Sequence, residues 1–425
     1  MKKLFSIAVA LTAFPVCAAD TSMMEALGKS VFFDPGLSIS GTQSCAFCHD
    51  PAAGFAPSDA ATNAGGVMAG AVAGLFGNRK PPSAAYAFAA PPLHHVMEEG
   101  APLFIGGAFH DGRATGNDTG NVLADQAMGP FLNPAEMAMP HAACVVAKVC
   151  AKGPADGYGI GLKDLDPGAC AMPLPETLSE DCATPGADIT LDDDTSAAVD
   201  SSFRLIARSL AAFEASAEVS PFSSRFDRWQ AGQAELTDEE RAGFGLFKDK
   251  ALCAECHVLD PSPKGEPALF TDFTYDNIGV PRNPQNPWYA QAANPDGAGW
   301  IDRGLAATLE GDAVYAPLAS FQEGKQKVPT LRNVDARPSA DAPRSYMHNG
   351  WFKTLDAVVH FYNTRDVLPA CDGDATEAEA LAKGCWPAPE VAANVNHDEL
   401  GNLKLTKAEE AAIVAFLRTL TDERP

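Results

Sequence analysis

The strongest constraint in this chain is a five-residue pattern, Cys-x-x-Cys-His, that occurs twice. The copies start 208 positions apart (253 minus 45) and consist of Cys45, Cys48 and His49, and of Cys253, Cys256 and His257. Two thiols separated by two residues can both bond to the vinyl groups of one haem, while the next histidine reaches the iron. A redox dithiol or a zinc site would leave that histidine unexplained. The sequence therefore predicts two covalently bound haem c groups with His49 and His257 as axial iron ligands.

The length of the chain, 425 residues with 46% hydrophobic composition, is enough for two compact cores. Apolar periodicity and two capping boxes predict four helices, at residues 22–32 and 195–216 and from the boxes at 237–240 and 406–409. Strand signals are weak. We therefore expect a mainly α fold with two cytochrome c-like haem domains and long loops. The expected N-terminal domain covers residues 20–235, with a boundary near Glu235, and the C-terminal domain covers residues 236–425.

The first nineteen residues have the pattern of a signal peptide. Lys2 and Lys3 are followed by an apolar stretch over residues 4–16, and Cys17-Ala18-Ala19 offers small residues for cleavage. A lipid anchor on Cys17 is disfavoured because Val16 stands where a small residue is wanted. No later segment has the roughly 18 consecutive apolar residues of a spanning helix. We expect export to the periplasm without membrane insertion.

The formal charge of −24 becomes −26 once Lys2 and Lys3 are removed. This acidity argues against nucleic acid and anionic membranes as partners. A basic small cytochrome c or a cupredoxin fits better as an electron donor. Alternatively, the charge only keeps an exported protein in solution.

Six cysteines remain after Cys17 and the haem motifs are set aside, and four of them lie in a segment rich in Gly, Pro and Asp over residues 141–194. This segment is predicted to be a disulfide-stapled insertion outside the core. An oxidising compartment favours disulfides. Pairing of sequence neighbours would give Cys144–Cys150, Cys170–Cys182 and Cys371–Cys385.

Several other segments resemble the bacterial dihaem cytochrome c peroxidases. They are Leu-Gly-Lys at 27–29, Phe-Phe-Asp-Pro at 32–35, Leu-Ser at 37–38, Phe-His-Asp-Gly-Arg-Ala at 109–114, Gly-Pro at 129–130, Asn-Pro-Ala-Glu-Met at 133–137, Pro-Thr-Leu-Arg-Asn at 329–333 and Tyr-Met-His-Asn-Gly at 346–350. The resemblance covers nearly the whole mature chain except the Cys-rich insertion. The family uses its N-terminal haem as the peroxide site and its C-terminal haem as a six-coordinate electron relay. The resemblance thus implies that His49 binds the peroxidatic iron and His257 the relay iron.

The same resemblance supplies candidates for the peroxide pocket. Peroxide cleavage needs an acid-base group near the open iron face. The carboxylate of the Asn-Pro-Ala-Glu motif, Glu136, matches the family residue with that role, and Gln126 and Pro130 match other residues of the pocket. Without the resemblance, Glu136 and Gln126 would be read as exposed residues.

The second axial ligand of the relay haem separates branches of the family. Ordinary members place a methionine there, whereas the matching position in this chain is Tyr362. A tyrosinate is a hard ligand that lowers the reduction potential. Tyr362 resembles the MauG-like branch, whose enzyme completes a tryptophan-derived cofactor in methylamine dehydrogenase. Alternatively, Tyr362 is a packing residue and Met347, His348 or His360 binds the iron.

The chain departs from the family pattern at two places. His110 stands where the family has a tryptophan between the haems, and about six extra residues lie between Arg113 and Gln126. His110 could pack, bridge the haems or bind the peroxidatic iron. Lys80 stands where the family has a calcium-binding asparagine. Nearby Asn78, with the carbonyls of Pro343 and Ser345, could replace it, so Ca²⁺ is left open.

Arg113 and Arg332 are expected to pair with haem propionates, because a guanidinium fork suits carboxylates. Surface salt bridges are the alternative for both arginines.

Three functions are compatible with these observations. The first is a peroxidase that reduces hydrogen peroxide to water with electrons from a small redox protein. The second is a MauG-like oxidase that uses peroxide to modify a side chain of a partner protein, which Tyr362 favours. The third is a dihaem electron carrier without catalysis, and Glu136, Gln126 and Pro130 argue against it. The sequence also leaves a homodimer open.

Overall fold

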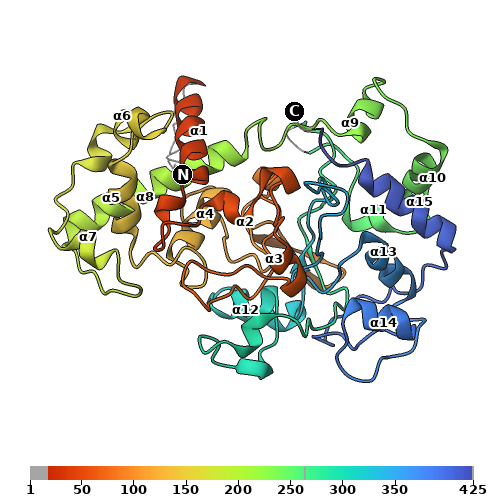
Figure 1. Ribbon diagram of the computed structural model, residues 1–425. Coiled ribbons are helices and arrows are strands. Elements are labelled where there is room, and N and C mark those ends of the chain that lie inside the picture. The colour runs from red at the N-terminus through yellow and green to blue at the C-terminus, as the bar shows by residue number, and fades with distance from the viewer. Residues whose placement is uncertain (1–17, 263–264, 424–425) are drawn as a thin grey trace, which may run out of the picture.

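The computed structural model describes residues 18–262 and 265–423, which form a mainly helical molecule (Figure 1). The helices of the N-terminal half are α1 (Ala18–Phe33), α2 (Cys45–Cys48), α3 (Ala60–Gly65), α4 (Val122–Leu132), α5 (Ala142–Cys150), α6 (Leu162–Leu165), α7 (Leu178–Asp181) and α8 (Asp193–Glu214). Those of the C-terminal half are α9 (Arg225–Gln230), α10 (Asp238–Lys248), α11 (Cys253–Cys256), α12 (Leu305–Glu310), α13 (Leu355–Thr364), α14 (Glu377–Lys383) and α15 (Lys407–Arg418). The expected mainly α fold is confirmed.

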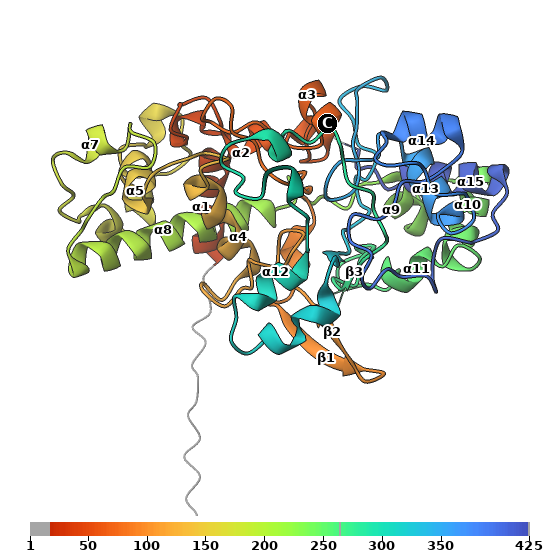
Figure 2. The same ribbon diagram turned by 90° about the horizontal axis from the view of Figure 1, so that it is seen from below.

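The strands are short and form two antiparallel pairs. One pair joins β1 (His94–Glu98) to β2 (Ala101–Ile105), with His94 opposite Ile105. The other joins β3 (Tyr275–Asp276) to β4 (Gln326–Lys327). The β1–β2 hairpin projects from the body of the molecule below α12 (Figure 2). Phe104 of the hairpin packs with Leu305 and Leu309 of α12 in a small apolar cluster of their own.

The first core is built on α8, which is the longest helix and runs across the left half of Figure 1. Its start is capped by Asp192, which accepts a hydrogen bond from the backbone N–H of Thr195. Its apolar stripe is buried as predicted. Helix α1 crosses α8 so closely at Gly28 that a Cβ there would lie 1.8 Å from the carbonyl oxygen of Ser209. The crossing fixes the helix that leads toward the first haem motif.

The second core has a similar construction. Both predicted capping boxes are present, at Thr237 before α10 and at Thr406 before α15. Helices α10 and α15 cross at Gly243, where a Cβ would lie 1.9 Å from the carbonyl oxygen of Ala412. This second core includes Phe226 of α9, so the change from one core to the other precedes the boundary expected near Glu235.

The two disulfides of the Cys-rich segment differ from the expected pairing. The bonds are Cys144–Cys182 and Cys150–Cys170, so pairing of sequence neighbours was wrong for these four residues. The reason is helical geometry. Cys144 and Cys150 both lie on α5, where six residues span about 9 Å along the axis. A disulfide holds its two Cα atoms at about 4.4–6.8 Å, which that spacing excludes. The third expected bond, Cys371–Cys385, is confirmed.

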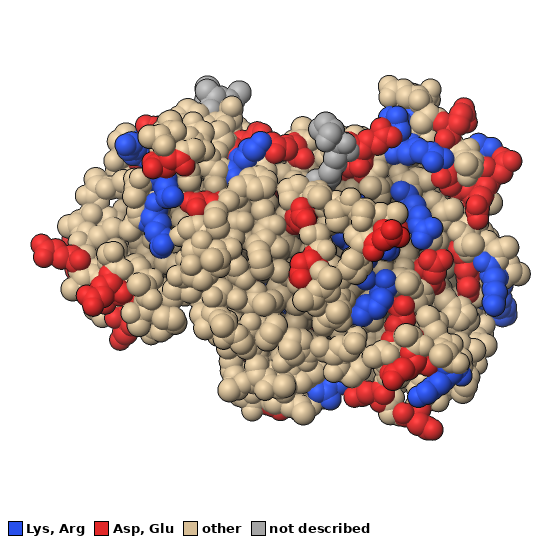
Figure 3. Space-filling view, in the orientation of Figure 1, with Lys and Arg blue, Asp and Glu red and all other residues tan. Residues whose placement is uncertain are grey.

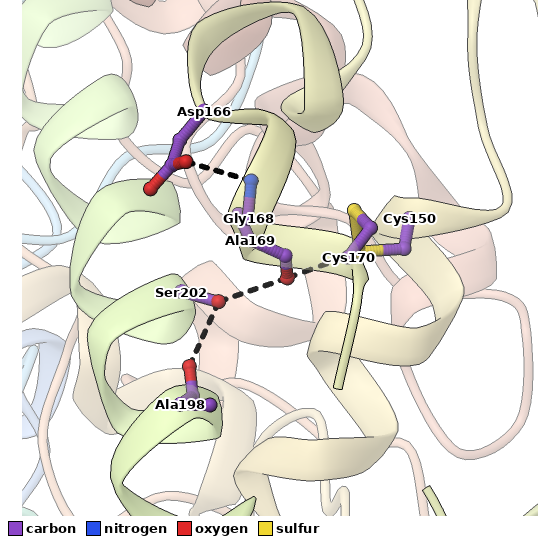
Figure 4. The surroundings of a disulfide bond; sticks show 7 residues. All are labelled: Cys150, Asp166, Gly168, Ala169, Cys170, Ala198 and Ser202. Carbon is purple, nitrogen blue, oxygen red and sulfur yellow. Dashed lines mark hydrogen bonds between the residues drawn. A yellow bond between two sulfur atoms is a disulfide. The ribbon is translucent and has the colours of Figure 1, made fainter. Parts of the chain in front are cut away.

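The Cys-rich segment is also more than a surface insertion. Val145, Val146 and Val149 of α5 are fully buried in the first core, which corrects the expectation that this segment lies outside it. The Cys150–Cys170 disulfide is connected to α8 through Ala169, the residue before Cys170. The hydroxyl of Ser202 on α8 lies 2.9 Å from the carbonyl oxygen of Ala169 and 2.9 Å from that of Ala198 (Figure 4). The disulfides therefore fasten part of the core.

None of the helices within residues 18–262 and 265–423 has the length and apolar character needed to cross a membrane. The predicted basic and apolar parts of the signal peptide, residues 1–17, lie outside the described residues.

Candidate haem-binding sites

The first motif forms the short helix α2 and the residue that follows it. The backbone N–H of His49 closes this helix by donating to the carbonyl oxygen of Cys45. The ring Nδ1 of His49 lies 3.2 Å from the carbonyl oxygen of Phe55. A carbonyl partner favours the Nδ1–H tautomer and leaves the Nε2 lone pair for a metal. Burial lowers the pKa of His49 and keeps the ring neutral.

The second motif repeats this arrangement on α11. The ring Nδ1 of His257 lies 2.8 Å from the carbonyl oxygen of Phe270, and burial lowers the pKa of His257 to about 4. In the described part of the chain, the cysteines outside disulfides are Cys45 and Cys48 of the first motif and Cys253 and Cys256 of the second.

A single cavity of about 530 Å³ connects the two motifs. Its lining includes all four motif cysteines and both motif histidines. Unpaired thiols, neutral imidazoles and a shared cavity are the features that two haem groups require. The residues of both sites therefore fit haem.

The three residues predicted for the peroxide pocket line this cavity. Gln126 and Pro130 of α4 and Glu136 of the following loop all line the cavity. Asn133 ends α4, and its Nδ2 donates to Oε1 of Glu136 at 2.8 Å. The half-buried Glu136 also lies near Cys48, because its charge adds to burial in raising the pKa of that thiol.

The environment of Glu136 raises the pKa of its carboxyl above the ordinary value. Burial raises the pKa of Glu136, while the charge of Arg113 and the hydrogen bond from Asn133 oppose the rise. A raised pKa makes the ionised carboxyl a stronger proton acceptor than an ordinary exposed one. This is the property that the predicted acid-base role needs.

Tyr362 lies on α13 and lines the cavity beside the second motif. Burial raises the pKa of its phenol, and the charges of Cys253 and Cys256 raise it further, which places the ring near that motif. Among the alternative ligands, Met347 and His348 also line the cavity. His360 does not line it, and its Nδ1 lies 3.0 Å from Glu410.

His110 and Lys80 also line the cavity. The Nε2 atom of His110 lies 2.9 Å from the carbonyl oxygen of Lys80, and the ring is 6.3 Å from that of His348. Burial, followed by the charge of His348, lowers the pKa of His110 to about 3. Burial also lowers the pKa of Lys80 to about 7, with Arg344 adding to the effect.

The residues named for a possible calcium site have protein contacts of their own. Lys80 is buried, and the carbonyl oxygen of Asn78 accepts a hydrogen bond from Asn286. Ser345 donates its hydroxyl hydrogen to Asn63. Within residues 18–262 and 265–423, no cluster of three or more His, Cys, Asp or Glu side chains could hold a metal ion. Calcium, which the sequence left open, stays open.

The two predicted propionate partners also have protein partners. Arg332 is buried, and its Nη1 and Nη2 donate to the carboxylate of Asp227 at 2.9 and 2.8 Å. Arg113 donates to Asp111 and lies 3.5 Å above the ring of Phe109. Both arginines line the cavity, and their pairing with propionates stays a prediction.

One cavity residue was missed by sequence reasoning. Glu214 ends α8, is only 6% exposed and lines the cavity. It follows Leu210 by four positions, so it falls on the apolar stripe of that helix. An acidic residue on a buried stripe is the signal that could have identified it.

Comparisons with known proteins agree with this architecture. Residues 22–158 match a family model described as di-haem cytochrome c peroxidase. The methylamine utilization protein MauG of Paracoccus denitrificans is 36% identical over 404 residues, which are 94% of this chain and 89% of that protein. The cytochrome c551 peroxidase of Nitrosomonas europaea is 26% identical, over 95% of this chain and 81% of its own length.

A solved structure is similar as well. The diheme peroxidase BthA from Burkholderia thailandensis superposes with a TM-score of 0.70 at 32% identity, covering 94% of this chain and 86% of that one. The family implies two haem cofactors and an oxidoreductase that acts on peroxide. This chain therefore belongs to the dihaem cytochrome c peroxidase family, which includes both the MauG proteins and the cytochrome c peroxidases.

Proposed function

We propose that this chain is a periplasmic peroxidase that reduces hydrogen peroxide to water with electrons from a small redox protein. Its two haems are attached through the four motif cysteines, with His49 and His257 as iron ligands. The observation that carries the proposal is Glu136, a carboxyl with a raised pKa held by Asn133 in the lining of the cavity beside the first motif. When bound, the haem irons supply the redox chemistry that cleaves the O–O bond.

The protein residues manage the protons of this reaction. Reduction of one peroxide consumes two electrons and two protons and yields two waters. Glu136 accepts the proton of the near oxygen and returns it to the leaving oxygen, so that water departs instead of hydroxide. Asn133 fixes the carboxyl for this exchange through its 2.8 Å hydrogen bond. Gln126 and Pro130 form the neighbouring wall.

The net charge of −24 supports a basic cytochrome c or cupredoxin as donor. On the face drawn in Figure 3, acidic and basic side chains are interspersed around a wide uncharged area. No field of one sign marks a docking place on that face. The acidity therefore favours encounter with a basic donor without fixing where it binds.

The variant Glu136→Gln tests this proposal. We expect peroxide consumption by the holoenzyme to slow by about 10²-fold or more, since a positioned acid-base group is lost. The matched control is Glu180→Gln, an exposed glutamate on α7. Wild-type peroxide kinetics in Glu136→Gln would remove this residue from the mechanism.

A second candidate function is that of a MauG-like oxidase, which takes the electrons from a side chain of a partner protein. The favouring observation is that Tyr362, not a methionine, stands at the relay position and lines the cavity beside the second motif. Turnover with reduced cytochrome c separates the two functions. Brisk peroxide-dependent oxidation of that donor supports the peroxidase, and its absence in an enzyme that still reacts with peroxide supports the oxidase.

A further inference from the structure

Glu214 is a buried acid that the proposed chemistry has not yet used. It is 6% exposed at the end of α8, lines the cavity and follows the buried side chains of Leu210 and Phe213. Among the described residues, its carboxyl has no hydrogen bond and no ion pair. The carboxyl oxygens are not sealed off from the cavity, so this acid can exchange a proton with a molecule bound there.

The elements packed against α8 offer Glu214 no counter-ion. Helix α1 carries Glu25 and Lys29, and the latter pairs with Glu218 at 2.6 Å. Helix α4 carries Asp125, which accepts from Thr119, and α5 carries Lys148, which donates to the carbonyl oxygen of Gly36. The short 3₁₀ helices 87–89 and 167–170, which also touch α8, carry no charged residue.

Glu214 lies close to the first motif. After burial itself, the charge of Glu214 is the largest influence that raises the pKa of the Cys45 thiol, and Glu136 acts on the same thiol. Both carboxyls therefore stand near one haem attachment point. Burial alone raises the pKa of Glu214 to about 8, so this side chain holds its proton at neutral pH.

We propose that Glu214 is the proton store of the first haem pocket and supplies one of the two protons consumed for each peroxide. This inference rests on the proposed peroxidase function. Glu136 only moves a proton between the two oxygens of peroxide, so the net protons must enter from elsewhere. The Glu214 carboxyl loses its O–H proton as water forms and becomes a carboxylate. It regains a proton from solvent as the donor protein delivers the next electrons. The second proton enters directly from solvent, so one turnover consumes two electrons from the donor and two protons.

Infrared spectroscopy of the oxidised holoenzyme tests where the proton resides, independently of activity. We expect a carbonyl band of a protonated carboxyl at neutral pH that disappears on titration with a midpoint near pH 8. The band should be absent from Glu214→Gln and present in Glu218→Gln, an exposed control near the end of the same helix. An unchanged band in Glu214→Gln would overturn the proposal.

The pH profile of turnover tests whether that proton is used. Wild-type turnover should fall as Glu214 loses its proton on the alkaline side. At neutral pH, the turnover rate of Glu214→Gln should be lower than that of the wild type by about tenfold or more. Its pH profile should also lack the fall at alkaline pH. If the pH profile of Glu214→Gln is identical to that of the wild type, Glu214 does not supply a proton during turnover. A wild type that shows the band but does not consume peroxide would refute the proposed function, and with it the use of the proton.

Discussion

Removing the carboxylate of Asp227 is expected to destabilise the protein strongly. Arg332 has no exposed side-chain surface, and its guanidinium donates twice to Asp227 and once to the carbonyl oxygen of Ala268. The same guanidinium lies 4.5 Å from the ring centre of Phe222 and 5.0 Å from that of Tyr86. Asp227→Asn leaves this cation buried without its counter-ion, which costs about 3–5 kcal/mol.

A double-mutant cycle separates the ion pair from the other contacts of Asp227. Asp227 also accepts from Ser224 at the start of α9, so the single variant loses part of a helix cap. Combining Asp227→Asn with Arg332→Met should give a coupling energy of about 2–3 kcal/mol, measured by urea unfolding of the holoenzyme at neutral pH. The control Asp200→Asn, from an exposed pair with Arg204, should cost at most about 0.5 kcal/mol.

The pH dependence gives an independent check. Burial alone would raise the pKa of Asp227, but the hydrogen bonds and charge of Arg332 outweigh it and hold the pKa below the ordinary value of 3.8. Such a carboxyl stabilises the fold fully above that value, and the stabilisation is lost as pH falls through its lower native pKa. The difference in free energy of unfolding between the wild type and Asp227→Asn should therefore become smaller below about pH 3.8. A difference under about 1 kcal/mol at neutral pH would show that Asp227 is not an important counter-ion of Arg332.

Three further predictions concern stability. Folding raises the pKa of Glu214 from 4.5 to about 8, so the free energy of unfolding should fall as pH rises between these values, by at most roughly 5 kcal/mol. Urea titrations of Glu214→Gln should not show this pH dependence. Replacing Cys150 and Cys170 together by Ser should cost about 3 kcal/mol in the same assay, and no loss would contradict the stabilising role of that loop closure. Gly28→Ala should lower the thermal midpoint because the new Cβ meets α8, whereas the control Gly245→Ala meets open space and should be neutral or stabilising.

The features that sequence predicted best depend on neighbours along the chain. Both capping boxes, at Thr237 and Thr406, and the apolar stripe of α8 were identified from short spacings and are present. Both hydrogen bonds of a capping box join residues within the first turn of the helix, so the box does not depend on contacts with distant parts of the chain. The same locality explains why each motif histidine directly follows a one-turn helix.

The features that sequence missed depend on tertiary contacts. The pairing of Cys144 with Cys182 is decided by how α5 meets α7, although the helical spacing of Cys144 and Cys150 could have excluded their bond. The contact of the Arg332 guanidinium with Asp227, 105 positions earlier, was likewise not indicated by the sequence. Glu214 was missed because it belongs to no family motif and only the packing of α8 shows that its side chain is buried.

The residues of the candidate site also divide into those that are neighbours along the chain and those that come from distant segments. Glu136, Gln126 and Pro130 lie within eleven residues of one another (126–136), and the structure brings them to one cavity wall. Tyr362 comes from a helix more than a hundred positions after its motif, and only the resemblance to a family singled it out. Its presence beside the second motif is compatible with the predicted ligand role, which the geometry leaves to experiment.

The most direct test of this account is a low-temperature electron paramagnetic resonance spectrum of the oxidised holoenzyme, recorded before and after stoichiometric peroxide. We expect a high-spin ferric signal from a haem with an open face and a low-spin ferric signal from a six-coordinate haem. Both signals should fade with peroxide, and the low-spin signal should change in Tyr362→Phe but not in Tyr315→Phe, whose ring lies outside the cavity. Two low-spin signals indifferent to peroxide would contradict the account and make this protein an electron carrier.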